Sequence, residues 1–448
     1  MTTRAGADAR RALWGWVMYD WANSAFQTTV VTVLAGPYLT ALAQHAVGEN
    51  GAILRIGAYT VVTAKSLFPY AISLSVLLQV FLLPVLGALA DYTNMKKRLM
   101  ACFCYVGVAA TCLLVFVTGR LYLMGILLFV VANLSFGASI VLYNAFLNDI
   151  TTPDRRDQVS SRGFAMGYLG GGLLLGLNLL LLLYAGPLGI SQEFAVRLSL
   201  LSAGLWWGGF SLITFAWLHV DTPARRVSPG RAIAMSLAQT RSTLADLRRL
   251  PRTLGFLTAY MFYNDGIQTV ISVSTVFIAQ ELFVSQGRAV DDSFLIALVL
   301  MIQFVAFFGA LLFERIAAVV RASNAILLSL VVWTLVVIYA YGFLRTTSQA
   351  WAMGAAIAVV LGGSQALSRS LFSRLIPAGK EASFFGLYEI SERGTSWIGP
   401  FMFGVVVSLT NSYRQAILSL IVLFVLGMLL LVVTDPDKAV RQAEAQPL

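Results

Sequence analysis

The chain has 448 residues, of which 58% are hydrophobic and only 12% are charged, and its mean hydropathy is +0.79. Soluble domains carry about 25% charged residues and about 45–50% apolar residues. Because this number of charged residues is too small to cover the surface of a water-soluble protein, most of the surface is expected to contact lipid. The formal charge of +10 does not indicate a nucleic-acid partner, because the basic residues are spread among short loops between apolar segments.

Twelve apolar segments are long enough to cross a bilayer, which takes roughly 20 residues per helix. In chain order they are expected at 14–44, 64–90, 99–118, 121–148, 161–185, 197–219, 253–282, 293–313, 322–343, 349–376, 382–409 and 412–433. This pattern predicts an all-α membrane protein with twelve transmembrane helices in two pseudo-symmetric six-helix bundles.

Lysines and arginines are distributed unevenly between the two sides of these segments. Of the 31, 23 lie on one side, seven lie on the other, and Arg393 lies within a segment. Because such residues accumulate on the cytoplasmic side, both termini are expected in the cytoplasm and the protein in the cell inner membrane. The predicted domains are an N-terminal bundle (1–219), a basic cytoplasmic linker (220–252), a C-terminal bundle (253–434) and a cytoplasmic tail (435–448).

The linker is the one sizeable polar insertion and contains seven arginines. Its apolar residues Ile233, Leu237, Leu244 and Leu247 fall on one face at helical spacing, with the arginines largely elsewhere. This spacing predicts an amphipathic helix that lies on the anionic inner leaflet. The alternative is a regulatory or partner-binding helix.

Polar residues recur at corresponding positions of the first and seventh segments. They are Tyr19, Asn23 and Gln27 in the first segment and Tyr260, Asn264 and Gln268 in the seventh. The spacing of four residues places each set along one stripe of its helix. Repeated six-helix halves place a substrate path at their interface near the middle of the membrane.

Charged side chains within apolar segments are costly to insert and therefore indicate function. Together with the repeated polar residues and an asparagine of the fourth segment, they form the predicted substrate and coupling cavity. Its members are Asp20, Asn23, Gln27, Asn144, Asn264, Asp265, Gln268, Arg369, Glu389, Glu392 and Arg393. Asp20 and Asp265 are expected to bind an ammonium group or to carry a coupling proton. The alternative is a structural pair that holds two helices together.

Glu389, Glu392 and Arg393 lie on one predicted helix. Glu389 and Arg393 have the favourable order for an ion pair between residues four apart, so the two charges can neutralise each other. That pairing leaves Glu392 without a local partner, and Arg369 in the preceding segment is the remaining cation. A contact between Glu392 and Arg369 would then form a latch that can open and close.

A tight turn is predicted between the second and third segments. Gly87 and Asp91 precede it, and the basic run Lys96, Lys97 and Arg98 follows it. This spacing resembles the signature of the loop between helices two and three in the major facilitator superfamily. The resemblance implies that Gly87, Asp91 and the basic run form a cytoplasmic gate, although Asn94 stands where glycine is common.

Other segments resemble the "unknown major facilitator" family, which is related to the autophagy-linked vacuolar amino-acid effluxers. They are Tyr19–Phe26, Ser160–Gly172, Tyr263–Gly266, Gly363–Ser370 and Phe384–Glu389. The resemblance spans nearly the whole chain. It implies the major facilitator fold and alternating access, with amino-acid export as the suggested activity.

We therefore expect a secondary transporter that moves a small polar metabolite, such as an amino acid, outward across the membrane, with protons as the candidate coupling ion. An enzyme is not expected, because no nucleophile–base pair or metal-ligand spacing is found. The lack of a Walker-type loop also argues against an ATP-driven pump. No cofactor and no metal are expected. The alternatives are a flippase-like transporter of lysolipids or other amphiphiles, and a membrane sensor that does not transport.

Overall fold

The computed structural model of the chain describes residues 2–48, 51–56, 59–64, 66–218, 229–393, 397–438 and 440. Helices dominate, and eleven helical stretches of this described part are long and apolar enough to cross a membrane. Large hydrophobic side chains such as Phe81, Phe308 and Val433 point outward from these helices. The predicted all-α membrane fold is confirmed.

The first half opens with one long span in which a nine-residue π-helix separates two α-helices. A short antiparallel hairpin follows, with Ala52 opposite Thr63 and Ile56 opposite Tyr59. The elements are α1 (Thr2–Ala25), the π-helix η1 (Phe26–Leu34), α2 (Ala35–Val47), β1 (Ala52–Ile56), β2 (Tyr59–Thr63), α3 (Leu67–Thr93), α4 (Lys96–Leu113), η2 (Leu114–Phe116), α5 (Tyr122–Ala145), α6 (Leu147–Ile150), η3 (Pro153–Arg155), α7 (Arg156–Leu183) and α8 (Gln192–Trp217).

The second half follows the linker helix α9 (Pro229–Arg249). Its elements are α10 (Pro251–Leu282), η4 (Val284–Gln286), α11 (Asp292–Val320), α12 (Ala322–Gly342), α13 (Thr347–Arg374), α14 (Glu381–Arg393), α15 (Ile398–Thr410), α16 (Tyr413–Ser419) and α17 (Ile421–Thr434). The segment expected at 382–409 is formed by α14 and α15, with residues 394–396 outside the described part. The predicted boundary between the first bundle and the linker also falls outside it, within 219–228.

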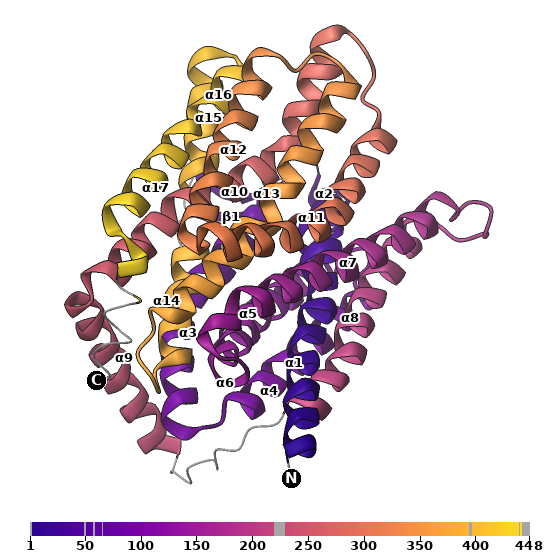
Figure 1. The fold of residues 1–448 in the computed structure, drawn as a ribbon. Coiled ribbons are helices and arrows are strands. Elements are labelled where there is room, and N and C mark those ends of the chain that lie inside the picture. The colour runs from indigo at the N-terminus through magenta and orange to yellow at the C-terminus, as the bar shows by residue number, and fades with distance from the viewer. Residues whose placement is uncertain are drawn as a thin grey trace.

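The two halves meet along two seams. On one side α7 packs against α11 and α13, and on the other α14 packs against α3 and α5. Figure 1 shows the N-terminus, α6 and α9 at the same end of the molecule. We call this the linker end, and it includes the α3–α4 turn and residues 375–380 between α13 and α14.

Glycines of α7 allow α1 to approach closely. A Cβ at Gly167 would lie 2.7 Å from the Ser24 hydroxyl oxygen, and one at Gly171 would lie 2.6 Å from the Thr28 hydroxyl oxygen. A side chain at either position would therefore force the neighbouring hydroxyl to move. α7 thus packs against the π-helical part of the first span, a type of helix that is rare and is often found at functional sites.

The tight turn between α3 and α4 explains the departure of Asn94 from the usual glycine. Asn94 has a φ of 54° and adopts the left-handed conformation. Asparagine tolerates this region better than other residues with a Cβ, because its short polar side chain bonds locally. Asparagine can therefore adopt the left-handed conformation that the turn requires at a position where glycine is common.

The apolar residues of the linker helix are not all covered in the same way. Leu237 and Leu244 are exposed, whereas Leu247 is buried against the protein, and the side chain of Ile233 lies outside the described residues. The protein therefore covers one of these apolar residues and leaves two uncovered, and contact of the helix with the inner leaflet stays a prediction. Spacing along a helix shows which residues are apolar, but it does not show whether protein or lipid covers them.

Candidate transport site

Arg369 is the only arginine that is buried at the interface of the two halves within the described part of the chain. It projects from α13 toward the first half, where its Nε donates to the Ser160 hydroxyl oxygen at 2.9 Å and its Nη2 donates to the Ser160 carbonyl at 2.9 Å. The guanidinium also lies over the rings of Trp16 and Phe164, at 4.8 and 4.2 Å from their centroids. Because arginine stays protonated in proteins, a positive charge is held permanently between the halves.

Asp20 of α1 supplies the negative charge opposite this guanidinium. Its Oδ2 accepts from both Nη atoms of Arg369 at 3.3 Å and from the Tyr143 hydroxyl at 2.7 Å. The Arg369 and Asp20 side chains are only 4% and 11% exposed. Removal of either partner would leave a charge buried without its counterion, which is strongly unfavourable.

Asn144 of α5 connects this ion pair to a second helix of the other half. Its Oδ1 accepts from Nη1 of Arg369 at 3.3 Å, and its Nδ2 donates to Glu389 Oε1 at 3.1 Å. Glu389 lies on α14 and is buried. We call the whole set the cross-half cluster, and it consists of Asp20, Tyr143, Asn144, Ser160, Arg369 and Glu389.

The cross-half cluster lies closer to the linker end than to the middle of the membrane spans. Arg369 is five residues from Arg374, where α13 ends, which corresponds to roughly 7.5 Å along a helix. Movement of α13 and α14 away from the first half at the linker end would therefore pull the cluster apart.

Asp265 lies elsewhere, although both aspartates lie near a repeated asparagine in the sequence. Its Oδ2 accepts from the backbone nitrogen of Gly399 at 2.8 Å, which ties α10 to α15 within the second half. Asp265 and Asp20 therefore bind different partners, and each contact joins two helices. The functional roles expected of the two residues stay predictions.

The remaining predicted cavity residues are divided among several places. The backbone carbonyl of Glu392 accepts from Asn264 at 3.2 Å, and its carboxylate accepts from Tyr260 at 3.0 Å. Asn23 is buried, Gln27 is exposed, Gln268 is partly buried, and the side chain of Arg393 lies outside the described residues.

The expected latch between Glu392 and Arg369 is corrected by the structure. Arg369 forms its ion pair with Asp20 of the first half, and the Glu392 carboxylate accepts instead from Tyr260. The prediction paired charges on neighbouring segments of the second half. The sequence does not show which helix of the first half faces α13.

Tyr143, Ser160, Trp16 and Phe164 are site residues that we did not predict. Neutral side chains carry no insertion cost comparable to that of a charge, so the search for intramembrane charges misses them. A signal existed nonetheless: Ser160 and Phe164 fall in a segment that carries the family resemblance. Gly163 between them is also required, because a Cβ there would overlap the Asp20 carboxylate.

The residues of the predicted gate lie between α3, α4 and the start of α14. The Asp91 carboxylate accepts from the backbone nitrogens of Ala382 and Ser383 at 3.1 and 2.8 Å and from the Ser383 hydroxyl at 2.7 Å. A Cβ at Gly87 would overlap the Ala382 carbonyl. These contacts hold α3 against the N-terminal end of α14, where the helix dipole favours a carboxylate.

Lys96 extends the gate with ion pairs to both halves. Its Nζ lies 3.2 Å from Asp149 and 3.4 Å from Glu381. Among the described residues, Lys97 and Arg98 form no ion pair, and the Arg98 side chain is exposed. Of the predicted basic run, only Lys96 therefore bridges the halves.

A second set of contacts closes the linker end between α7 and α13. Arg374 lies 2.6 Å from the Asp157 carboxylate, which also accepts from the Ser370 hydroxyl. Arg156 and Asn148 both donate to the Ser373 carbonyl, at 2.9 and 3.1 Å. Both seams are thus closed at the linker end.

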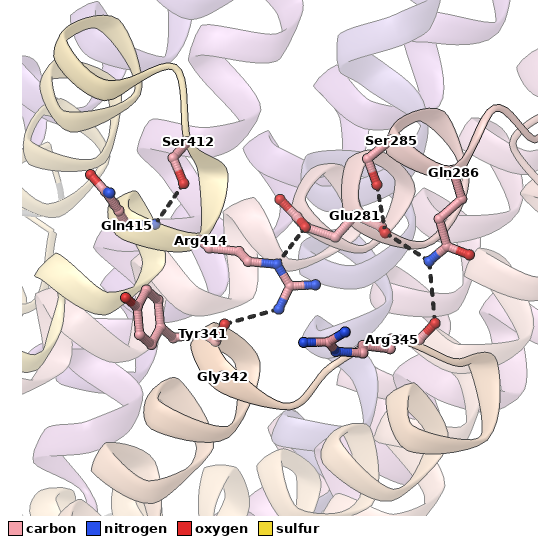
Figure 2. Close-up of a pocket in the computed structure, with 9 residues that line it drawn as sticks. All are labelled: Glu281, Ser285, Gln286, Tyr341, Gly342, Arg345, Ser412, Arg414 and Gln415. Carbon is pink, nitrogen blue, oxygen red and sulfur yellow. Dashed lines mark hydrogen bonds and ion pairs between the residues drawn. The ribbon is translucent and has the colours of Figure 1, made fainter.

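A hollow of about 820 Å³ opens at the opposite end of the second half, away from the cross-half cluster. Figure 2 shows Arg414 reaching Glu281 and the carbonyl of Tyr341, at 2.7 and 2.9 Å. Arg414 also donates to the Leu344 carbonyl at 2.6 Å. These bonds tie α10, α12 and α16 together, which is a structural role.

Comparisons with known proteins agree with this arrangement. A family model described as "Vacuole effluxer Atg22 like" matches residues 8–444. The chain is 30% identical over 435 residues to an uncharacterized MFS-type transporter, YxiO, of Bacillus subtilis, and the match covers 96% of each chain. It is 27% identical over 460 residues to autophagy-related protein 22-1 of Penicillium rubens, covering 84% of this chain and 76% of that one.

Solved structures show the same fold at low sequence identity. The human organic anion transporter MFSD10 (TETRAN) matches with a TM-score of 0.67 and 15% identity, covering 94% of this chain and 99% of that one. The major facilitator superfamily transporter FucP in the outward conformation matches with a TM-score of 0.68 and 11% identity, covering 95% and 98%. The chain therefore belongs to the Atg22-like vacuole effluxer family within the major facilitator superfamily, and it is a multi-pass membrane transporter of small molecules rather than an enzyme.

Proposed function

We propose that the protein exports a zwitterionic metabolite, an amino acid or a related compound, by alternating access between its two halves. The observation that carries this proposal is the buried ion pair between Asp20 and Arg369, in which the two charges come from different halves. We further propose that the protein lies in the cell inner membrane with the linker end and both termini in the cytoplasm.

The pair matches the two charged groups of an amino acid. A substrate carboxylate can replace Asp20 on the Arg369 guanidinium, whose planar donors suit a carboxylate. A substrate ammonium group can in turn replace Arg369 on the Asp20 carboxylate. Binding of such a substrate would separate the two residues without leaving either charge unpaired, so the linker end could open.

Protons are the proposed coupling ion. When the halves separate without substrate, Asp20 loses the Arg369 cation, and a carboxylate without a counterion in an apolar site favours the protonated, neutral form. Glu389 would lose the hydrogen bond from the Asn144 amide in the same movement. Proton uptake would then accompany an opening of the linker end without substrate, and bound substrate would replace the proton.

Transport into proteoliposomes tests the proposal. The purified protein is given a panel of radiolabelled amino acids, peptides, sugars and lysolipids, with and without a pH gradient. We expect exchange of zwitterionic amino acids, a response to the gradient, and loss of exchange in Arg369→Gln. Arg162→Gln is the matched control, because Arg162 is an exposed arginine of α7.

Three outcomes would overturn the proposal. Transport of sugars or lysolipids without amino acids would exclude the zwitterionic substrate. Absence of transport of every solute by folded protein would favour the sensor. Unchanged amino-acid exchange in Arg369→Gln would show that the cross-half cluster does not contact the substrate.

A further inference from the structure

The linker helix α9 lies in the seam between the two halves at the linker end. It packs mainly against α3 of the first half, and it also contacts α10 and α14 of the second half. Ser236, Thr243 and Leu247 are buried and Thr240 is partly buried, and these four residues form one stripe along α9. Figure 1 shows α9 beside α3 at this end.

Polar contacts hold α9 to both halves. The Thr240 hydroxyl lies 3.4 Å from the Pro84 carbonyl of α3, in the first half. Asp246 forms an ion pair with Lys380, which precedes α14 in the second half. Because α9 bridges the seam, separation of α3 from α14 would break at least one of these contacts.

A second stripe of α9 points away from the protein. It consists of Leu237, Arg241, Leu244 and Arg248, all of which are exposed, and we call it the Leu/Arg flank. Its residues follow those of the buried stripe by one position, which places it about 100° around the helix from that stripe. On a rigid helix, this angle fixes the direction of the flank whenever the buried stripe occupies the seam.

The chemistry of the Leu/Arg flank fits the surface of an anionic bilayer. Helices with leucines beside arginines bind at the boundary between headgroups and acyl chains, and each basic residue there contributes attraction to anionic lipid. The position of α9 supports this match, because its neighbours α3 and α10 cross the membrane. Two leucines and two arginines alternate along the flank. The arginines can therefore bind headgroup phosphates while the leucines contact acyl chains.

We propose that the Leu/Arg flank docks on anionic phospholipid and that lipid bound there stabilises the closed linker end. The lipid meets the flank only while the buried stripe holds α9 in the seam. When α3 and α14 separate, α9 loses its contact with α14 and the ion pair to Lys380, so the direction of the flank is no longer fixed. The lipid therefore binds the closed form more tightly than the open form, which is the condition for shifting the equilibrium.

Distance measurements between spin labels test this inference without a transport substrate. Labels are placed at Asp154→Cys and Ala378→Cys, two exposed positions at the linker end of the first and second halves, in a background without the native cysteines. The full chain is reconstituted in nanodiscs of phosphatidylcholine, with and without phosphatidylglycerol. We expect the anionic lipid to raise the ratio of closed to open molecules, by up to about fivefold for each arginine that contacts the surface.

The double variant Arg241→Gln/Arg248→Gln is expected to lose this lipid response. The matched control Arg155→Gln/Arg315→Gln removes the same charge from exposed positions at the linker end and is expected to keep it. The proposal would be overturned if Arg241→Gln/Arg248→Gln kept the full response to anionic lipid, or if both double variants lost that response equally. The absence of any lipid effect on the unsubstituted protein would overturn it as well. None of these outcomes depends on substrate identity, so the proposed function is tested separately.

Discussion

Replacement of Asp20 by asparagine removes the negative charge opposite Arg369 and keeps the size of the side chain. When the linker end is closed, both Nη atoms of Arg369 then lack the charged acceptor that lies 3.3 Å away in the unsubstituted protein. The neutral acceptors Ser160 and Asn144 remain in place. We therefore expect Asp20→Asn to favour the open linker end, because the lost contact joins the two halves only when that end is closed.

The size of the effect follows from the burial of the pair. Removal of one partner of a buried ion pair costs about 3–5 kcal/mol. Because Arg369 keeps three hydrogen bonds to neutral acceptors, we take the lower limit. A cost of about 3 kcal/mol corresponds to a change of about 150-fold in the ratio of closed to open molecules.

The spin-label pair at Asp154 and Ala378 measures this ratio directly. Asp265→Asn is the matched control, since Asp265 is also a buried carboxylate but bonds to Gly399 within the second half. We expect the control to leave the distance distribution unchanged. A ratio in Asp20→Asn within about twofold of the unsubstituted protein would refute the assignment of the ion pair as a closing contact.

Three further substitutions test other parts of the structure. Gly163→Ala should shift the same label distances toward the open form, because its Cβ would overlap the Asp20 carboxylate; Gly176→Ala, whose Cβ would meet its nearest neighbour at 3.9 Å, should not. Asp91→Asn should raise the ratio of open to closed molecules by at least about tenfold, since the two backbone nitrogens donate to different oxygens of Asp91 and the amide NH2 group would face one of these donors. An unchanged distance distribution would argue against the gate. Arg414→Ala should lower the melting temperature of the detergent-solubilised protein, at a cost of about 2 kcal/mol, while leaving the label distances unchanged; an unaltered melting temperature would contradict its structural role.

Several members of the cross-half cluster were predictable one by one. Asp20, Arg369 and Glu389 are charges within apolar segments, and the cost of such charges in lipid singles them out without any knowledge of their neighbours. Their partners were not predictable. Asp20 and Asp265 have similar sequence surroundings, yet one bridges the halves and the other joins two helices of the same half.

The sequence alone determined that the chain is a membrane protein with an all-α fold, because the number and length of apolar segments leave no other way to satisfy the backbone in lipid. It also indicated the turn at Asn94 and the candidate gate residues Gly87, Asp91 and Lys96, which lie close together in the chain, but not their partners on α14. Only the tertiary structure decided that Arg369 pairs with Asp20 rather than Glu392, and that α9 buries its serine and threonine stripe. Both outcomes depend on how helices far apart in the sequence rotate and pack, and the spacing of residues along one helix does not specify its neighbours.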